Sequence, residues 1–545
     1  MGNARRFGRE YFWFALALMA ILLGSAAHAA AEDPVAGTKK PTVEELEQRI
    51  AVLEQALQAQ QRALESLQAS QAAAASPSGL ASQPPAGQPP AGQPPGPPAA
   101  PVPSAPAQAR APPSHPVTEQ QAGSATQSTP QIFAGPGGFS FQSADGANQI
   151  RFHGEFDFDG RFYNDNLTPE GSRDTWLLRR ARPIVEGTFA NIFDFRFNPD
   201  FAGGKTVIQD AFVAARFDPL FVVTAGKFKE PFGLERLQLS PNNRFIELGL
   251  PSDIVPNRDL GLQVSGTYTF PTGTLTYQVG YFNGVVDGVS TDANSTPDVD
   301  NNDRKDWVAR LFAQPFLTTD SVFRNLGAGV AVGWVKEVGS ATNTLLPTYK
   351  TETQRNFFSY DPATNTAGPT IAKGERLRVS PQAYYYYRSF GLLTEYVAES
   401  QDVSRTFGTG AKALTRRARL DPNSWQVGAN FLVTGEEATF GTLVPNRPFA
   451  LDSPGWGALE FAARVSELKL DPATFYGPAG TVEWFADSSV QAREAKAWTL
   501  GMNWYLTQNV AWYLDYTKTN FDGGAPDGKN RPDESAFLTR FQVAF

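Results

Sequence analysis

The sequence of 545 residues contains no cysteine and only three histidines. Without cysteine the chain has no disulfide and no thiolate that could act as a nucleophile or bind a metal. Of the histidines, His28 lies in a leader segment, His115 in a proline-rich stretch and His153 in the remainder of the chain. A Ser–His–Asp arrangement could therefore use His153 alone. We therefore expect that the chain binds no cofactor and no metal and that it is not an enzyme.

Long apolar runs are also missing beyond the N-terminus. The run YFWFALALMAILLG follows Arg5, Arg6 and Arg9 and precedes the small residues of SAAHAAAED. This order is typical of a secretory signal peptide, and we assign it to residues 1–30. The alternative, an uncleaved anchor, is disfavoured because the run is shorter than the roughly 20 residues of a spanning helix. Any membrane crossing by the rest of the chain would need strands.

Residues 41–71 carry a heptad pattern. Steps of three and four residues select a seam of seven aliphatic residues and one glutamine, which predicts a coiled-coil helix that brings copies of the chain together. A lone solvated helix is the alternative, but it would leave the aliphatic side chains in water. The seam consists of Val43, Leu46, Ile50, Leu53, Leu57, Gln60, Leu64 and Leu67.

Residues 72–130 are rich in proline, alanine and glycine, as in QPPAGQPPAGQPPGPPAAPVP. Such a segment cannot bury enough apolar surface to fold, and its prolines favour an extended spacer. We therefore expect a disordered linker between the coil and the domain that begins near residue 131.

The stretch IRFHGEFDFDGRFY, residues 150–163, alternates between two kinds of side chain. Its even positions are Phe, Ile or Gly, and its odd positions from Arg151 to Arg161 are charged or His. A period of two is that of an extended strand with unlike media on its two faces. One strand alone does not distinguish a soluble sandwich from a membrane barrel.

The same pattern recurs along residues 131–545 and predicts an all-β domain. Connections after even-numbered strands are mostly short, whereas those after odd-numbered strands are mostly long and acidic. An even strand number with this segregation of loop lengths is typical of a sixteen-stranded antiparallel transmembrane β-barrel of the bacterial outer membrane. The predicted strands are 149–163, 175–189, 191–201, 206–217, 221–229, 261–270, 273–283, 306–316, 326–336, 375–388, 390–400, 424–433, 457–469, 497–507, 509–519 and 536–545.

Several segments of this domain together resemble the phosphate-selective porin O and P family. They include RRARPIVEGTF, GKFKEPFGLE, LLTEYV, FLVTGEE, GALEFAARVSELKLD, LGMNWYLTQNV and the terminal phenylalanine. The resemblance implies an outer-membrane porin of sixteen strands that assembles as a homotrimer. It also implies that the third extracellular loop, here residues 230–260, folds into the barrel, and that basic residues line an anion path.

Predicted inward positions carry fourteen basic and ten acidic side chains, so the lumen is mildly positive. Basic groups in a narrow pore concentrate anions, and arginine can bind phosphate or carboxylate through paired hydrogen bonds. Alternatively, many of these charges pair across strands and only hold the wall together. We place Lys227, Lys229, Arg236 and Arg244 nearest the narrowest point. The other candidates for the anion path are Arg180, Arg182, Arg196, Arg216, Arg310, Arg376, Arg378 and Arg464.

The overall charge opposes a simple anion preference. Residues 131–545 carry 39 Lys plus Arg and 46 Asp plus Glu. Acidic outer loops repel anions before they reach a basic constriction. Two alternatives to an anion channel therefore stay open: a general non-selective porin, and a structural barrel tethered to the cell wall through the coil. The expected partners are small anionic solutes such as phosphate or polyphosphate, outer-membrane lipid and two further copies of the chain, without nucleic acid.

Overall fold

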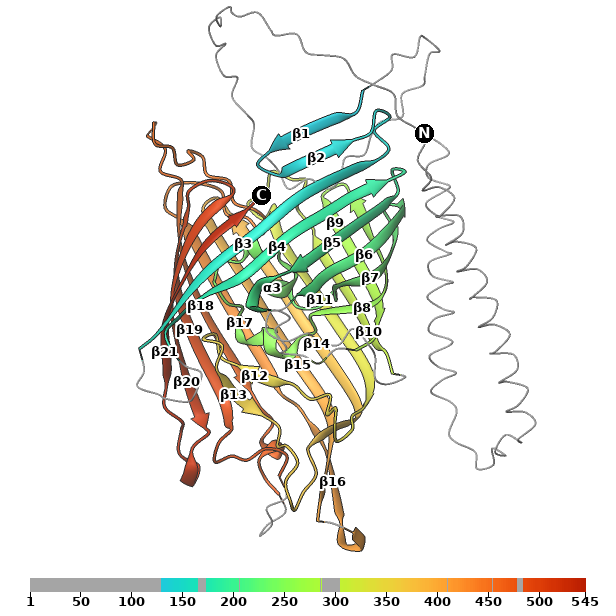
Figure 1. Cartoon of the computed structure of the whole chain (residues 1–545), viewed down its shortest axis with the longest axis vertical. Coiled ribbons are helices and arrows are strands. Elements are labelled where there is room, and N and C mark those ends of the chain that lie inside the picture. Colours follow the sequence, from blue (N-terminus) through green and yellow to red (C-terminus); the bar gives the residue numbers. More distant parts are fainter. Residues whose placement is uncertain are drawn as a thin grey trace, which may run out of the picture. The chain divides into compact units, whose positions relative to one another are not determined.

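The computed structural model describes residues 129–545, except 165–172, 205, 285, 287–303, 409, 453 and 478–483. The predicted signal peptide, coiled coil and nearly all of the linker lie outside these residues. Sixteen strands form an antiparallel barrel (Figure 1), which closes where the last strand pairs with the first. They are β3 (Gln149–Tyr163), β4 (Thr175–Phe189), β5 (Phe193–Asp200), β6 (Val207–Asp218), β7 (Phe221–Lys229), β8 (Arg258–Phe270), β9 (Gly273–Phe282), β10 (Asp306–Gln314), β11 (Asn325–Val338), β14 (Ile371–Tyr387), β15 (Phe390–Phe407), β17 (Asn423–Leu432), β18 (Ala458–Lys469), β19 (Ala492–Tyr505), β20 (Val510–Gly523) and β21 (Glu534–Ala544).

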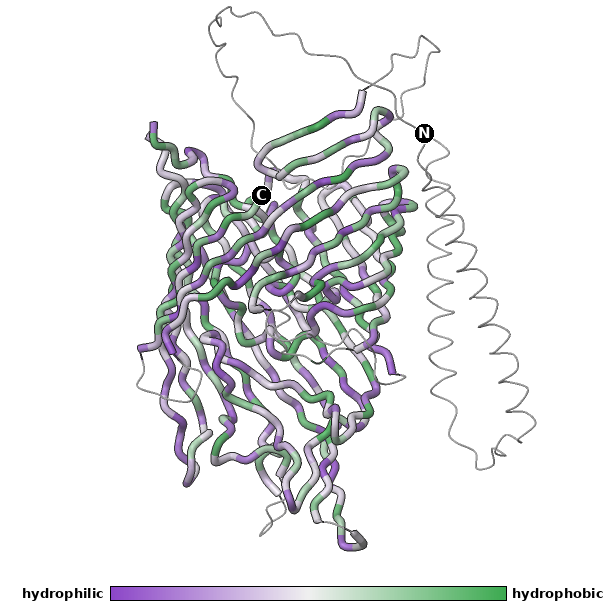
Figure 2. The backbone as a smooth tube through the Cα atoms, in the orientation of Figure 1, coloured by the Kyte–Doolittle hydropathy of each residue, from purple (hydrophilic) through white to green (hydrophobic). Residues whose placement is uncertain are grey.

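The alternation that predicted the strands separates the two faces of the wall. On β3 the carboxylates of Glu155, Asp157 and Asp159 are buried inside, whereas Phe156 and Phe158 are exposed outside. Figure 2 shows the same alternation of hydrophilic and hydrophobic residues along the strands around the barrel. The apolar face meets lipid and the polar face meets the lumen, as the sequence predicted.

Two strands before β3 were not predicted. β1 (Gln131–Gly135) and β2 (Gly138–Gln142) form a hairpin that pairs with the start of β3 through Phe139↔Phe152 and three further residue pairs. The C-terminal strand β21 pairs with β3 only from Glu155 onward. The hairpin therefore continues the wall next to the terminal residue, and residues 131–142 extend the barrel rather than adding a spanning strand.

Two elements on the side of the long loops were also missed. β15 continues seven residues beyond its predicted end and pairs with β16 (Leu414–Leu420), whose sequence LTRRARL lacks an apolar alternation. β12 (Thr348–Lys350) and β13 (Asn356–Ser359) form a small separate sheet.

The rule of short connections after even-numbered strands fails at one place. β17 is the twelfth barrel strand, yet residues 433–457 separate it from β18. This connection folds into the lumen, where the ring of Phe440 stacks on Tyr384 with centroids 4.9 Å apart. Burial inside the barrel explains its apolar residues, such as the buried Ala438 and Leu443.

Three connections from the other rim also enter the lumen and form a core there. The connection after β7 contains α3 (Leu234–Leu237) and the short 3-10 helices η2 (Ser240–Asn242) and η3 (Leu250–Ile254). Its buried residues contact the β12–β13 sheet and Phe475 of the connection after β18. Tyr349 stacks on Phe358 at 5.3 Å, and Phe358 meets Phe475 edge-on at 6.0 Å. No helix among the described residues is long and apolar enough to span a membrane.

Candidate functional site

Residues 230–257, here called the crossing loop, lie in the lumen and attach to two groups of wall strands. On one wall, the Glu235 carboxylate pairs with Arg464 of β18 at 2.8 Å and accepts a hydrogen bond from Gln426 of β17 at 2.9 Å. The backbone N–H of Leu234 donates to Glu395 of β15 at 2.7 Å. These contacts are buried, so they hold the start of the crossing loop firmly against β15, β17 and β18.

The second attachment of the crossing loop is to β3 and β4. Glu247 pairs with Arg161 at 2.7 Å and with Arg179 at 3.3 Å. Burial alone would raise the pKa of Glu247, but the two arginines outweigh burial and lower the pKa to about 2. Glu247 is therefore ionised throughout the physiological pH range.

A cavity of about 90 Å³ lies between the crossing loop and the wall made by β4, β7 and β8. Seven basic side chains line it against two acidic ones, Glu247 and Asp253. The basic side chains are Arg179, Arg180, Arg182, Lys229, Arg236, Arg258 and Lys350.

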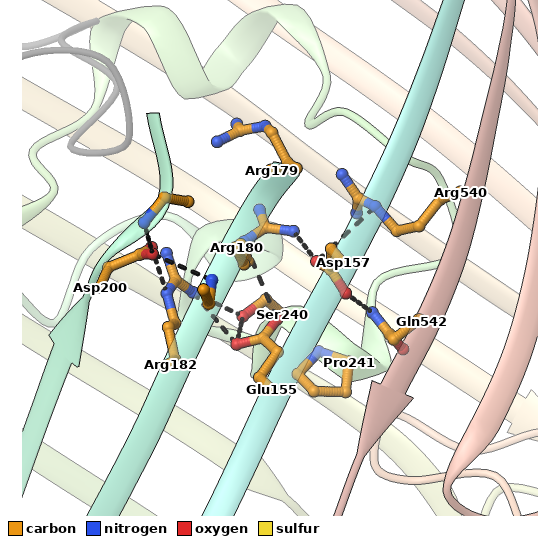
Figure 3. Close-up of polar contacts among 12 residues, drawn as sticks. Glu155, Asp157, Arg179, Arg180, Arg182, Asp200, Ser240, Pro241, Arg540 and Gln542 are labelled. Carbon is orange, nitrogen blue, oxygen red and sulfur yellow. Dashed lines mark hydrogen bonds and ion pairs between the residues drawn. The ribbon is translucent and has the colours of Figure 1, made fainter. Parts of the chain in front are cut away.

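Figure 3 shows how carboxylates on neighbouring strands fix the arginines of β4. Arg180 donates to Asp157 at 2.7 Å, and Arg182 donates to Asp200 at 2.7 Å and to Glu155 at 3.1 Å. Such charge-assisted hydrogen bonds fix the orientation of the guanidinium groups along the lining. Arg182 also donates to the hydroxyl of Ser240 in the crossing loop, at 3.1 Å.

Three groups from outside the β4 wall complete the charge of the cavity. Lys229 donates to the backbone carbonyl of Gln238, and Arg236 donates to that of Ser252 at 2.6 Å. Burial raises the pKa of Asp253 to about 8, although a hydrogen bond from the Lys350 backbone N–H at 3.0 Å acts in the opposite direction. Asp253 is thus mostly protonated at neutral pH, and Glu247 is the ionised carboxylate of the lining.

The structure brings four of the twelve candidates predicted from the sequence into this cavity: Arg180, Arg182, Lys229 and Arg236. Most of the others pair elsewhere on the wall, and Lys227 is buried on β7 without lining the cavity. Arg196 pairs with Glu186 at 2.6 Å, Arg216 with Asp194 at 2.6 Å, Arg376 and Arg378 with Asp306, and Arg310 donates to Gln382 at 3.0 Å.

Arg244 was expected at the narrowest point, and it does not line this cavity. Its guanidinium donates to the backbone carbonyl of Thr439 and lies 3.5 Å from the carboxylate of Glu460. It also reaches the hydroxyl of Tyr505 at 3.3 Å. Arg244 thus joins the crossing loop to residues 433–457. Arg464 likewise holds Glu235 and Glu352 and does not line the cavity.

Arg179, Arg258 and Lys350 line the cavity but were not predicted. A β-bulge between Asp157 and Phe158 of β3 shifts the pairing with β4, so that Arg179 and Arg180 both face inward. Two consecutive arginines in a membrane strand were a signal for this, since strict alternation would place one of them in lipid. Arg258 and Lys350 lay in segments read as loops, where alternation gives no direction.

A closed sixteen-stranded barrel with an apolar outer band and a charged constriction defines a channel-forming protein of the bacterial outer membrane. The family model for phosphate-selective porin O and P matches residues 149–545. The chain therefore belongs to this family of porins.

Solved structures with a similar fold are distant in sequence. The outer-membrane channel DcaP of Acinetobacter baumannii is 11% identical, with 74% of this chain and 99% of that chain covered and a TM-score of 0.44. An anion-selective porin from Comamonas acidovorans is 10% identical, with coverages of 73% and 100% and a TM-score of 0.41. OmpT of Vibrio cholerae is 11% identical, with coverages of 73% and 98% and a TM-score of 0.42. The comparison with curated proteins found no match.

Proposed function

We propose that this porin conducts small anions, such as phosphate or polyphosphate, by passive diffusion past the crossing loop. The observation that carries the proposal is the cavity with seven basic and two acidic lining residues. One of the two acids, Asp253, is mostly protonated at neutral pH. An anion in this cavity would be surrounded by guanidinium and ammonium groups that bind oxygen atoms.

The acidic excess of residues 131–545 does not oppose this proposal at the constriction. Exposed charges in the wide mouths are screened by salt over about 10 Å at 0.1 M ionic strength. Charges around a narrow cavity between the crossing loop and the wall act in a lower dielectric and at contact distance. The few groups of the lining therefore govern which ions pass.

We further propose that the chain assembles as a homotrimer. The heptad seam of residues 41–71 and the family resemblance support a homotrimer in outer-membrane lipid, with the coil and the proline-rich linker available for a contact with the cell wall. This segment also supports a second function, a structural barrel that tethers the membrane, which would need no ion selectivity. A general porin without preference is the third possibility, and the net acidic charge favours it.

Conduction by the purified full chain in planar bilayers distinguishes these functions. We expect the reversal potential in a salt gradient to indicate anion preference, and phosphate to reduce the chloride current because it occupies the basic cavity. A cation-selective channel would contradict the proposal. A zero reversal potential would indicate the general porin, and a folded barrel without conductance would indicate the structural tether.

A further inference from the structure

The hairpin of β15 and β16 projects beyond the barrel wall on the side of the long loops. The end of β15 pairs with β16 from Gln401↔Leu420 to Phe407↔Leu414. In Figure 1 this hairpin reaches further from the barrel than the strands beside it. Three arginines lie on β16, and none of them lines the basic cavity: Arg416, Arg417 and Arg419.

One face of the hairpin is packed against another connection of the same rim. Leu420 and Val403 form a buried cluster with Phe485, which belongs to the connection after β18. The guanidinium of Arg416 lies 4.7 Å from the centroid of the Phe485 ring and donates to the backbone carbonyl of Tyr476 at 2.6 Å. These contacts fix the position of the hairpin and leave its other face outside.

The outer face of the hairpin carries the remaining two arginines, because side chains alternate along a strand. Arg419 contacts Asp402 of β15 at 3.0 Å and Glu375 of β14 at 3.6 Å. Glu375 lies two residues from Leu377, whose side chain is exposed on the outside of the barrel. The outer face with Arg417 and Arg419 therefore continues the lipid-facing surface of β14.

Two lysines extend this surface to β11 and β14. The pairs Lys336↔Glu375 and Val338↔Lys373 place both lysines next to the hairpin, and both are exposed. We call this set the basic face, and it consists of Lys336, Lys373, Arg417 and Arg419 with the carboxylates of Glu375 and Asp402. Among the residues that the structure describes, no carboxylate forms an ion pair with Lys336, Lys373 or Arg417.

The basic face begins at the edge of the hydrocarbon layer. Trp334 and Leu377 are neighbours on adjacent strands and are both exposed on the outside. An outward tryptophan near a strand end marks the membrane interface. Lys336 lies two residues beyond Trp334, about 7 Å along the strand. The basic side chains thus lie at the level of lipid head groups rather than of acyl chains.

We infer that the basic face binds the phosphate groups of the phosphorylated glycolipid in the outer leaflet of the bacterial outer membrane. Arginine binds phosphate oxygens through paired hydrogen bonds, and lysine adds a compact positive charge. A lipid is favoured over a dissolved anion because the basic face continues the lipid-facing wall and lies outside the lumen. Basic residues beside a membrane-spanning segment attract anionic head groups. This contact goes beyond the proposed function, since it does not involve the anion path.

The strands β18, β19 and β20 provide a matched control on the same rim. Lys496 and Lys518 also lie two residues beyond outward aromatic residues, Trp498 and Tyr516. Their charge is balanced, however, because each exposed lysine of these strands has a carboxylate partner. The pairs are Lys469 with Glu494 at 3.9 Å, Lys496 with Glu467 at 3.5 Å and Lys518 with Asp533 at 3.3 Å.

Native mass spectrometry of the full chain in mild detergent measures the bound lipid. The probe is bisphosphorylated lipid A, with a chelator present so that no divalent cation bridges phosphates and carboxylates. The basic-face variant replaces three residues: Lys336→Gln, Lys373→Gln and Arg417→Gln. It should retain several-fold less lipid A than the wild type, whereas glutamine at the three paired lysines should leave the amount nearly unchanged. Heat-modifiable mobility confirms that both variants fold.

Two results of this experiment would overturn the inference. One is an equal loss in both variants, or no loss in the basic-face variant. The other is equal binding of dephosphorylated lipid A to the wild type, which would show that acyl chains rather than phosphates are bound.

The absence of cysteine allows a second measurement with a single nitroxide label. Thr415→Cys places the label on the outer face of β16, and Asn520→Cys places it on the outer face of β20, where both native side chains are exposed. Bisphosphorylated lipid A should reduce collisions with a water-soluble reagent several-fold more at position 415 than at position 520. Equal protection would contradict the inference. Loss of the protection in inorganic phosphate at equal ionic strength would indicate a site for free phosphate and would also contradict it. Neither readout involves ion flow, so failure of the proposed anion conduction would leave these results unaffected.

Discussion

The two sides of the crossing loop use the same residue types for opposite purposes. Toward β15, β17 and β18, a buried cation is enclosed by carboxylates: Arg464 contacts Glu235 at 2.8 Å and Glu352 at 2.9 Å. Toward β4, β7 and β8, basic side chains outnumber acidic ones around a cavity. The inward direction of an arginine therefore does not define its role. The number of nearby carboxylates decides whether the arginine anchors the crossing loop or lines the anion path.

This difference has a physical origin. A buried charge must be paired and hydrogen-bonded, so the anchored side is closed by matched groups. On the path side the arginines of β4 are also buried and paired with carboxylates, but more basic than acidic side chains line the cavity. The crossing loop needs both sides, because the anchors hold it at the distance from β4 that creates the cavity.

The largest expected effect comes from removing an anchor. Arg464→Met leaves Glu235 and Glu352 buried without their shared cation, which should lower the free energy of unfolding by about 3–5 kcal/mol. Denaturant unfolding in detergent measures this loss. Single-channel conductance should rise as well, because the crossing loop is released from β18. An unchanged unfolding midpoint would show that Arg464 is not an anchor.

Arg244→Met should have a smaller effect. It removes a hydrogen bond to the carbonyl of Thr439, but Glu460 keeps hydrogen bonds from Asn430 at 2.6 Å and Tyr505 at 2.8 Å. We expect a loss of about 1.5–3 kcal/mol in unfolding free energy, typical of a hydrogen bond to a charged group. Ion selectivity should not change, since Arg244 does not line the cavity. A change in reversal potential would show that Arg244 does contribute to the anion path.

The pH dependence of ion selectivity tests the role of one cavity residue, Asp253. Because the pKa of Asp253 is about 8, raising the pH from 7 to 9 adds a negative charge to the cavity. Anion preference should fall over this range, and Asp253→Asn should abolish the fall.

The free energy of unfolding should also depend on the protonation of Asp253. The folded chain retains a proton on Asp253 that the unfolded chain has lost, so this group makes the unfolding free energy decrease between about pH 4 and pH 8. Asp253→Asn should remove that component of the pH dependence. Identical pH profiles for the variant and the wild type would contradict the assigned pKa.

The smallest effect is expected at an exposed pair. Arg419 of β16 contacts Asp402 at 3.0 Å, but 56% of its side chain is exposed. Arg419→Met should leave the midpoint of denaturant unfolding almost unchanged, because solvent screens an exposed ion pair. A loss as large as that of Arg464→Met would mean that burial does not separate anchors from surface pairs.

Sequence alone predicted most of the barrel, and four of the twelve residues predicted for the anion path line the cavity. The period of two places Arg180 and Arg182 inside because a membrane wall has one wet and one apolar face. Alternation fails at the bulge that turns Arg179 inward, and it gives no direction for Lys350 in a connection. The predicted strands 424–433 and 457–469 left a long connection between them, but no pattern in it predicted that residues 433–457 fold into the lumen.

The separation of anchors from path residues was beyond local patterns. Glu235 and Arg464 are distant in sequence, and only the tertiary fold brings them together. The same holds for Lys229 and Lys350, which approach the cavity from β7 and from the β12–β13 sheet. Inward direction could be predicted, whereas neutralisation by a distant carboxylate could not.

The most direct test of the central claim compares two variants that each replace three basic residues by glutamine. Lys229→Gln, Arg236→Gln and Lys350→Gln change the cavity, whereas Arg216→Gln, Arg388→Gln and Arg419→Gln change residues that do not line it. The measurement is the reversal potential in a salt gradient for folded barrels in planar bilayers. We predict a clear shift toward cations for the cavity variant and a value near that of the wild type for the control. Equal shifts in both, or none in the cavity variant, would contradict the claim that the charge of this cavity controls permeation.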